Sequence, residues 1–250
     1  LTKEDLRANG EDLKAEDARP GDRIRTATVG STGVPVTVWQ YKAVPLEAYS
    51  WRTMSWWGID PSMDGAYSWR MRNRRQTRWE RWTNRLLWWP TIKLRMDASC
   101  MTPKSIEAFV RRYNRVRPKL LEGYVGAVHE IALYIRESNI EVAAPRAIWV
   151  TSSPVTRVQR AIIEAAFRGP VYDQYGCCEV PGLAAQCGKR AAMHINHDGR
   201  LIEFVDDEGR TVPTGQTGRI LLTDLEDFMY PLIRYENEDL GRAVEGRCPC

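Results

Sequence analysis

The stretch AIWVTSSPVTRVQRAIIEAAFRGPVYDQY, residues 147–175, decides the fold class of this chain. It begins with the short apolar run 147–151, whose composition predicts a buried strand. Residues 155–167 predict a helix, with Val158, Ile162 and Ala165 on its buried face. The run 171–175 predicts the next strand. A strand, a helix and a strand in this order predict an α/β layer with parallel pairing.

Two more helices are predicted before this stretch. Thr102-Pro103 is a cap followed by proline in the first turn, and Arg117-Pro118 ends the helix that starts there. The residues predicted to face the core are Ile106, Phe109, Val110 and Tyr113 in this helix and Val128, Ile131, Ala132 and Ile135 in the next.

The chain after residue 188 has a different pattern. Two strands, 201–205 and 218–223, flank an acidic turn that contains Gly209, which predicts a β-hairpin. The sequence therefore predicts an α/β fold with mostly parallel sheet layers flanked by helices, followed by a smaller β-rich subdomain. We place the boundary between residues 1–186, the α/β core, and residues 187–250.

Charge, hydropathy and cysteine content limit the classes of protein to which this chain can belong. The net charge is +4, but residues 1–150 hold 25 Lys/Arg against 17 Asp/Glu, whereas residues 151–250 hold 11 against 15. No run of 18 apolar residues predicts a membrane span, and no signal peptide is visible. Six cysteines, two of them adjacent at Cys177-Cys178, do not form a disulfide framework, which favours a reduced, cytoplasmic protein.

Residues 51–89 are rich in tryptophan and arginine. Eight of the ten tryptophans lie here, and Trp79, Trp82, Leu86 and Trp89 follow helical spacing. This spacing predicts that the aromatic side chains pack into the core while the arginines stay solvated. The alternative is a binding surface for nucleic acid or an anionic membrane.

A glycine- and hydroxyl-rich loop, TVGSTG at 28–33, is a candidate phosphate cradle. Its glycines allow close backbone approach, and hydroxyls and backbone N–H groups can bind phosphate oxygens. A Gly/Ser turn between two strands has the same composition, so the loop alone leaves both interpretations open.

A second candidate group follows the strand 171–175. Tyr175, Gly176 and Glu179 stand at its carboxyl end, where open α/β sheets bind ligands. Tyr175 could stack on a purine and Glu179 could hold Mg²⁺. Further on, Asp239 could accept hydrogen bonds from a ribose diol.

These motifs together carry a family resemblance. The loop at 28–33 with Pro35, the Tyr175-Gly176-x-x-Glu179 motif, the segment Pro231-Leu232-Ile233-Arg234-Tyr235-x-x-x-Asp239 and Cys248-x-Cys250 occur in the order of one family. The chain resembles the phenylacetate–CoA ligase/CapK-like branch of the adenylate-forming enzymes along its whole length.

The resemblance implies ATP-dependent activation of a small, aromatic carboxylic acid to an acyl-adenylate, followed by transfer to coenzyme A or another thiol. By motif, the phosphates would contact Thr28, Gly30, Ser31, Thr32 and Gly33. Tyr175 and Gly176 would bind adenine, Glu179 Mg²⁺ and Asp239 the ribose, with Thr32 and Glu179 as catalytic residues. Gly123 and Tyr124 would line the acid pocket. The expected partners are ATP, coenzyme A and the acid, and not nucleic acid.

The chain departs from the family pattern in two ways. Cys178 stands where a hydroxyl residue commonly precedes the glutamate, and a thiol is a weak donor. The sequence stops before the family's C-terminal lid, so we expect the core of a longer enzyme or a remnant that binds without turnover. The competing function is a non-catalytic binding module that uses residues 51–89.

A metal site is also predicted. Cys187, His194, Cys248 and Cys250 offer three thiols and one imidazole, a tetrahedral zinc set. The spacing is not that of a standard zinc finger, so thiols without a metal are the alternative. The resemblance favours zinc, since some relatives hold a structural zinc with similar residues.

Overall fold

The computed structural model describes residues 1–17, 19–27, 35–70 and 77–250, which form two compact units. We call Leu1–Ser50, Tyr175–Ala185 and Ala191–Cys250 the split β unit, and Trp51–Gln174 with Gln186–Arg190 the α/β unit. This division differs from the predicted boundary at residue 186. The reason is packing, because Leu6 and Val38 near the N-terminus share a core with Ile220 and Leu222.

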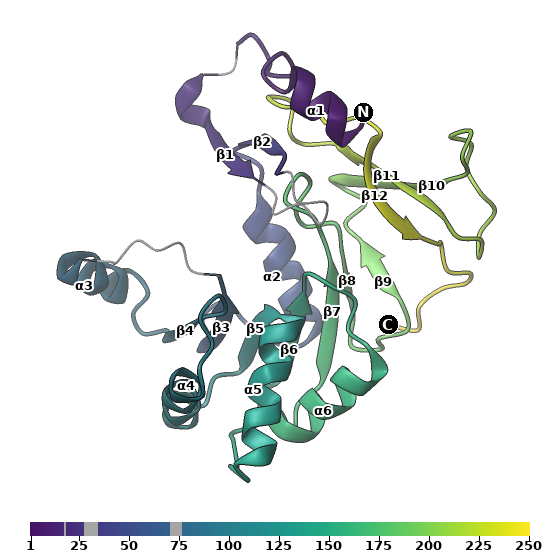
Figure 1. Cartoon of the computed structure of the whole chain (residues 1–250). Coiled ribbons are helices and arrows are strands. Elements are labelled where there is room, and N and C mark those ends of the chain that lie inside the picture. The colour runs from purple at the N-terminus through teal and green to yellow at the C-terminus, as the bar shows by residue number, and fades with distance from the viewer. Residues whose placement is uncertain (18, 28–34, 71–76) are drawn as a thin grey trace. The chain divides into compact units, whose positions relative to one another are not determined.

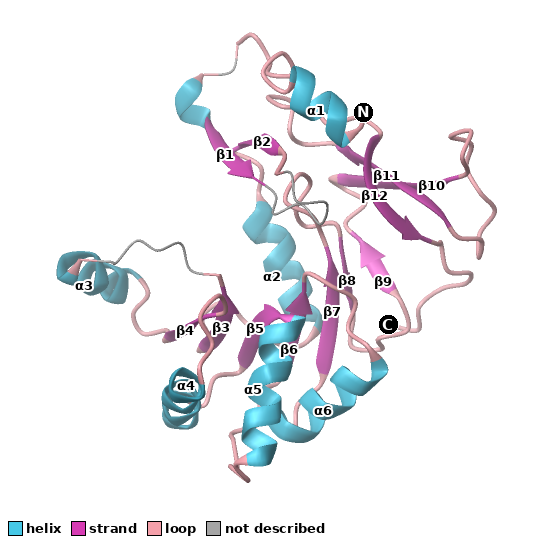
Figure 2. Cartoon of the chain, in the orientation of Figure 1, coloured by secondary structure: helices cyan, strands magenta, loops and turns pink. Residues whose placement is uncertain are grey.

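Parallel strands organise the α/β unit (Figures 1 and 2). Strand β3 pairs with β4 and β5, β5 with β6, and β6 with β7, all in parallel. The largest sheet has the order β4-β3-β5-β6-β7-β8-β9. Its strands are β3 (Gly65–Trp69), β4 (Lys93–Asp97), β5 (Leu120–Tyr124), β6 (Ala147–Thr151), β7 (Val171–Tyr175), β8 (Ala184–Gln186) and β9 (Met193–Ile195). The predicted strands at 147–151 and 171–175 and the mostly parallel sheet are confirmed.

Three helices build the main core of this unit: α4 (Pro103–Val116), α5 (Val125–Glu137) and α6 (Arg157–Phe167). Thr102 caps α4, and the chain leaves that helix at Arg117 in a left-handed conformation. The predicted core faces of α4 and α5 are both confirmed. They pack with Leu121, Ile148 and Val150 of the sheet. A smaller cluster contains Met54, at the end of α2 (Leu46–Trp56), and Trp57, which stacks on Tyr172.

The predicted buried face of α6 is wrong at two of its three residues, whereas Ile162 is half-buried and packs against the main core. Val158 is 68% exposed and Ala165 is exposed, whereas Ile163, Ala166 and Phe167 are buried. Thr156 caps the helix, so it begins at Arg157. The apolar residues of this segment form two overlapping stripes, and packing against the sheet selects the stripe that contains the aromatic ring.

The predicted burial of the tryptophan stripe is also wrong. Trp79, Trp82, Leu86 and Trp89 are 70%, 57%, 64% and 77% exposed. The first three lie on α3 (Arg78–Leu87), and Figure 1 shows this helix set apart from α5 and α6 of the same unit. The helical spacing was correctly identified, but a helical stripe does not specify what covers it.

Besides β9 and most of β8, the split β unit contains small antiparallel sheets and two short helical segments. Strand β1 (Arg23–Ala27) pairs with β2 (Thr37–Tyr41), and β10 (Arg200–Val205) pairs with β11 (Gly218–Asp224), which pairs with β12 (Tyr235–Gly241). The predicted hairpin is thus confirmed. Helix α1 (Lys3–Asn9) begins at a capping box made by Thr2 and Asp5, and a 3₁₀ turn spans Pro20–Asp22.

None of the helices that the structure describes combines the length and apolarity needed to cross a membrane.

Candidate functional site

Tyr175 and Asp239, both predicted site residues, are brought into contact in the split β unit. The Tyr175 hydroxyl donates to Oδ2 of Asp239 at 2.9 Å. Asn237 donates from Nδ2 to the same carboxylate oxygen at 2.7 Å and to the Tyr175 hydroxyl at 2.6 Å. Burial is the main cause that raises the pKa of Tyr175. The hydroxyl therefore remains protonated and acts as a donor to the carboxylate.

Asn237 is a site residue that the motif comparison missed. It lies between Tyr235 and Asp239 in β12, where the pairing register with β11 shifts. Its side chain is buried and bridges Tyr175 and Asp239. Its place inside the quoted motif, two residues before Asp239, is the signal that could have identified it.

Glu179 lies in the turn after β7 and is only 7% exposed. The Tyr235 hydroxyl donates to its Oε1 at 2.8 Å, which fixes the carboxylate. Burial, followed by the charge of Glu179, raises the pKa of Tyr235, so this donor also remains protonated. A fixed carboxylate is a suitable ligand for a hard cation such as Mg²⁺.

The turn that carries Glu179 is held by its own backbone and by β2. The Val180 N–H donates to Sγ of Cys177 at 3.3 Å, and the Gln40 side chain donates to the Cys178 carbonyl at 2.6 Å. Burial raises the pKa of the Cys177 thiol, which disfavours a thiolate nucleophile there. Cys178 is exposed.

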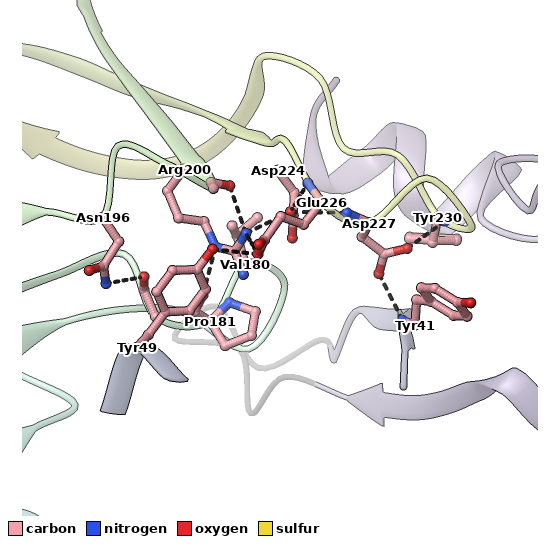
Figure 3. Close-up of polar contacts among 12 residues, drawn as sticks. Tyr41, Tyr49, Val180, Pro181, Asn196, Arg200, Asp224, Glu226, Asp227 and Tyr230 are labelled. Carbon is pink, nitrogen blue, oxygen red and sulfur yellow. Dashed lines mark hydrogen bonds and ion pairs between the residues drawn. The ribbon is translucent and has the colours of Figure 1, made fainter. Parts of the chain in front are cut away.

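A buried arginine fixes the segment that follows this turn (Figure 3). Arg200, at the start of β10, is completely buried. Its Nε donates to the Pro181 carbonyl at 2.9 Å, and its Nη1 donates to Asp224 at 2.7 Å and to Glu226 at 3.2 Å. The Tyr49 hydroxyl also donates to Glu226, and the Tyr49 ring lies 4.9 Å from the guanidinium carbon. The network joins the Glu179 turn to the end of β11.

Asp227 extends the network along the same loop. Its carboxylate accepts hydrogen bonds from the backbone N–H groups of Tyr41 and Tyr230, both at 2.9 Å. Burial raises its pKa, and these hydrogen bonds oppose that effect. Asp227 thereby attaches β2 to the loop between β11 and β12.

Gly123 and Tyr124, the predicted acid-pocket residues, end strand β5 of the α/β unit. A Cβ at Gly123 would lie 2.6 Å from the Ser68 carbonyl oxygen, so only glycine allows β3 and β5 to pair this closely. Tyr124 contacts Trp69, the last residue of β3, edge to face with ring centroids 4.7 Å apart. Two aromatic rings therefore lie together at the carboxyl ends of β3 and β5.

Glu122 precedes this pair on β5. It lies in register between Tyr67 of β3 and Trp149 of β6. Burial raises the pKa of its carboxyl to about 7, and the nearby Lys93 opposes that shift. Sequence patterns did not indicate this group, because a single glutamate in an apolar strand carries no motif.

Three of the four predicted zinc ligands gather in the split β unit. The ligand atoms of His194, Cys248 and Cys250 lie within 4.8 Å of one another, and Cys250 Sγ is 3.6 Å from His194 Nε2. A tetrahedral zinc with ordinary Zn–S and Zn–N bonds requires an S–N separation of about 3.6 Å. Cys187 lies in the short Gln186–Arg190 segment of the α/β unit and is buried. The three gathered side chains fit a zinc ion.

The predicted phosphate loop, with Thr28, Gly30, Ser31, Thr32 and Gly33, lies outside the described residues. The structure describes the two strands on either side of it, β1 and β2.

The curated proteins that are similar to this chain include CapK and phenylacetate–coenzyme A ligases. The chain is 27% identical to the protein CapK of Staphylococcus aureus over 157 residues, which is 62% of this chain and 33% of CapK. It is 33% identical to the phenylacetate–coenzyme A ligase of Aromatoleum evansii over 97 residues, which is 37% of this chain and 22% of the ligase. The chain thus matches a third or less of the length of these relatives. No protein-family model matches it.

Comparison with solved structures identifies proteins that share the fold of this chain. The whole chain superposes on 60% of a 2-hydroxyisobutyryl-CoA ligase, crystallised in an open conformation with 2-HIB-AMP and CoA, with a TM-score of 0.80 and 19% sequence identity. It also superposes on VinN with a TM-score of 0.62 and 18% identity, over 97% of this chain and 65% of VinN.

Proposed function

Because the chain belongs to the adenylate-forming ligase family, in the branch of CapK and the phenylacetate–CoA ligases, we propose that it provides the adenylate-binding core of an acid–thiol ligase. The observation that carries the proposal is the Tyr175–Asn237–Asp239 cluster next to the fixed carboxylate of Glu179. Together they offer an aromatic ring, one carboxylate (Asp239) for a ribose diol and, in Glu179, a cation ligand.

The proposed reaction joins an acid to AMP. The carboxylate of the substrate attacks the α-phosphate of ATP, an acyl-adenylate forms and pyrophosphate leaves. Thr28, Gly30, Ser31, Thr32 and Gly33 would donate to the phosphates, with Thr32 as a catalytic residue. Tyr175 and Gly176 would hold adenine, and Asp239 would accept the ribose hydroxyls. Mg²⁺ held by Glu179 would neutralise phosphate charge as the attack proceeds.

A small aromatic acid is the substrate class that the α/β unit favours. Trp69 and Tyr124 present ring edges and faces at the carboxyl ends of neighbouring parallel strands, and aromatic rings favour such offset contacts with other rings. Coenzyme A or another thiol would then accept the acyl group.

Thermal unfolding with a non-hydrolysable aryl-adenylate and Mg²⁺ tests the proposal. A ligand at one hundred times its Kd adds about 2.7 kcal/mol, which for a chain of this size raises Tm by roughly 5–10 °C. The same compound without its adenine is the control and should leave Tm unchanged. An equal Tm with and without the adenylate at saturating concentration would rule out a competent nucleotide site.

We also propose a structural zinc held by Cys187, His194, Cys248 and Cys250. The gathered positions of the last three support it, and Cys187 would complete the tetrahedral set. Thiolate ligands favour a reducing compartment such as the cytoplasm.

Metal analysis of protein purified without chelator should find about one zinc per chain. Cys248→Ser should lose most of it, because three ligands hold zinc far less tightly than four. Cys100→Ser removes an exposed thiol elsewhere and is the matched control. Zinc-free wild-type protein, or equal zinc in both variants, would contradict this site.

A further inference from the structure

An apolar surface on the α/β unit is not used by the proposed reaction. It comprises the exposed side chains Trp79, Trp82, Leu86, Leu87, Trp88, Trp89 and Ile92, each 46–78% exposed. The rings of Trp79 and Trp82 stack with centroids 5.3 Å apart. Contiguous exposed apolar patches of this kind mark interaction sites. We call this set the tryptophan patch.

The helix that carries the patch is also basic. Its sequence contains Arg78, Arg81 and Arg85. Glu80 is the single acidic residue of this helix. Nearby, Lys93 lies over the Trp88 ring at 3.3 Å from its centroid.

We propose that α3 and the tryptophan patch bind an anionic lipid surface. Helices that lie in the bilayer interface combine tryptophan and leucine on one face with lysine and arginine on the polar face. The apolar side chains would enter the headgroup–acyl boundary, and the positive charge of the helix would attract the anionic headgroups. The interaction is independent of the adenylate site, since no residue of that site takes part.

Two other occupants fit the patch less well. A second copy in a two-fold contact would bring two α3 helices together, and the sequence of each is basic. Single-stranded nucleic acid would need free ring faces. However, three of the seven side chains of the patch are aliphatic, and Trp79 and Trp82 already stack on each other. An apolar phase with anionic headgroups matches both the apolar patch and the positive charge of α3.

Co-sedimentation with vesicles tests the proposal. The net charge of two on α3, at about 1 kcal/mol each, predicts roughly 30-fold stronger binding to vesicles with phosphatidylserine than to phosphatidylcholine alone. The combined variant Arg78→Gln, Arg81→Gln, Arg85→Gln should lose this preference. The combined variant Trp79→Ser, Trp82→Ser, Leu86→Ser should weaken binding to both vesicles by more than about tenfold.

Trp51→Ser is the matched control, since Trp51 is a 54% exposed tryptophan of the same unit outside the patch. It should bind vesicles as the wild type does. Three results would overturn the proposal: absence of vesicle binding by wild-type protein, dimerisation that the serine variant abolishes, or oligonucleotide binding that the serine variant abolishes. Circular dichroism confirms that each variant is folded, so a loss of binding reports on the surface.

Discussion

Replacement of Arg200 by methionine is expected to lower the free energy of unfolding by about 3–5 kcal/mol, the usual effect of removing one partner of a buried ion pair. Arg200 is 0% exposed, and the side chain of its partner Asp224 is 5% exposed. Methionine fills part of the volume but leaves Asp224 charged and without its partner in a region from which water is excluded. The Pro181 carbonyl also loses its donor.

Urea denaturation of both proteins measures this effect. Arg210→Met is the matched control, because Arg210 also pairs with two carboxylates but its side chain is 73% exposed. An exposed pair contributes about 0–1 kcal/mol, so the control should unfold almost as the wild type does. Equal effects in the two variants would show that burial of Arg200 does not govern the stability of this unit.

Replacement of Tyr175 by alanine is expected to weaken binding of an aryl-adenylate by about 5- to 150-fold, which corresponds to the 1–3 kcal/mol of stacking between a base and an aromatic ring. The variant also removes the hydroxyl that donates to Asp239, so the proposed ribose ligand loses a fixed partner. Titration calorimetry with the adenylate mimic gives the affinity.

Tyr175→Phe separates the two contributions. Phenylalanine keeps the ring and removes the hydroxyl, so binding should fall only a few-fold, as expected for one hydrogen bond of about 1 kcal/mol. If alanine leaves the affinity unchanged, Tyr175 is not the adenine residue. If phenylalanine is as weak as alanine, the hydroxyl rather than stacking accounts for the effect.

Local pattern was sufficient to predict the parallel layer. Helices α4 and α5 each present one unambiguous apolar stripe, so Ile106, Tyr113, Val128 and Ile135 were placed in the core correctly. The same reasoning was wrong for α6 and α3. On α6 two apolar stripes overlap and the sequence does not show which one is buried. On α3 the apolar stripe exists but is exposed. A stripe indicates that a helix is amphipathic and does not identify what lies against it.

The candidate site was only partly predictable. Tyr175, Glu179 and Asp239 follow a family motif, and the first and last of them do meet as partners. Asn237 was missed and Tyr235 was given no role, because their roles depend on which side chains of β12 point toward the turn after β7. Arg200 gave no signal in the sequence, although it connects three segments.

The sequence by itself determined the strand, helix and strand of residues 147–175, the helices α4 and α5, the cap of α4 and the hairpin, because these depend on neighbours within a few residues. Tertiary structure alone decided which segments share a core and which charges are buried. The contact between Tyr175 and Asp239 spans 64 residues, and that between Tyr49 and Glu226 spans 177. Such contacts form only when segments that are distant in the sequence pack together. Packing removes water, so each buried polar group must bond to another group of the protein.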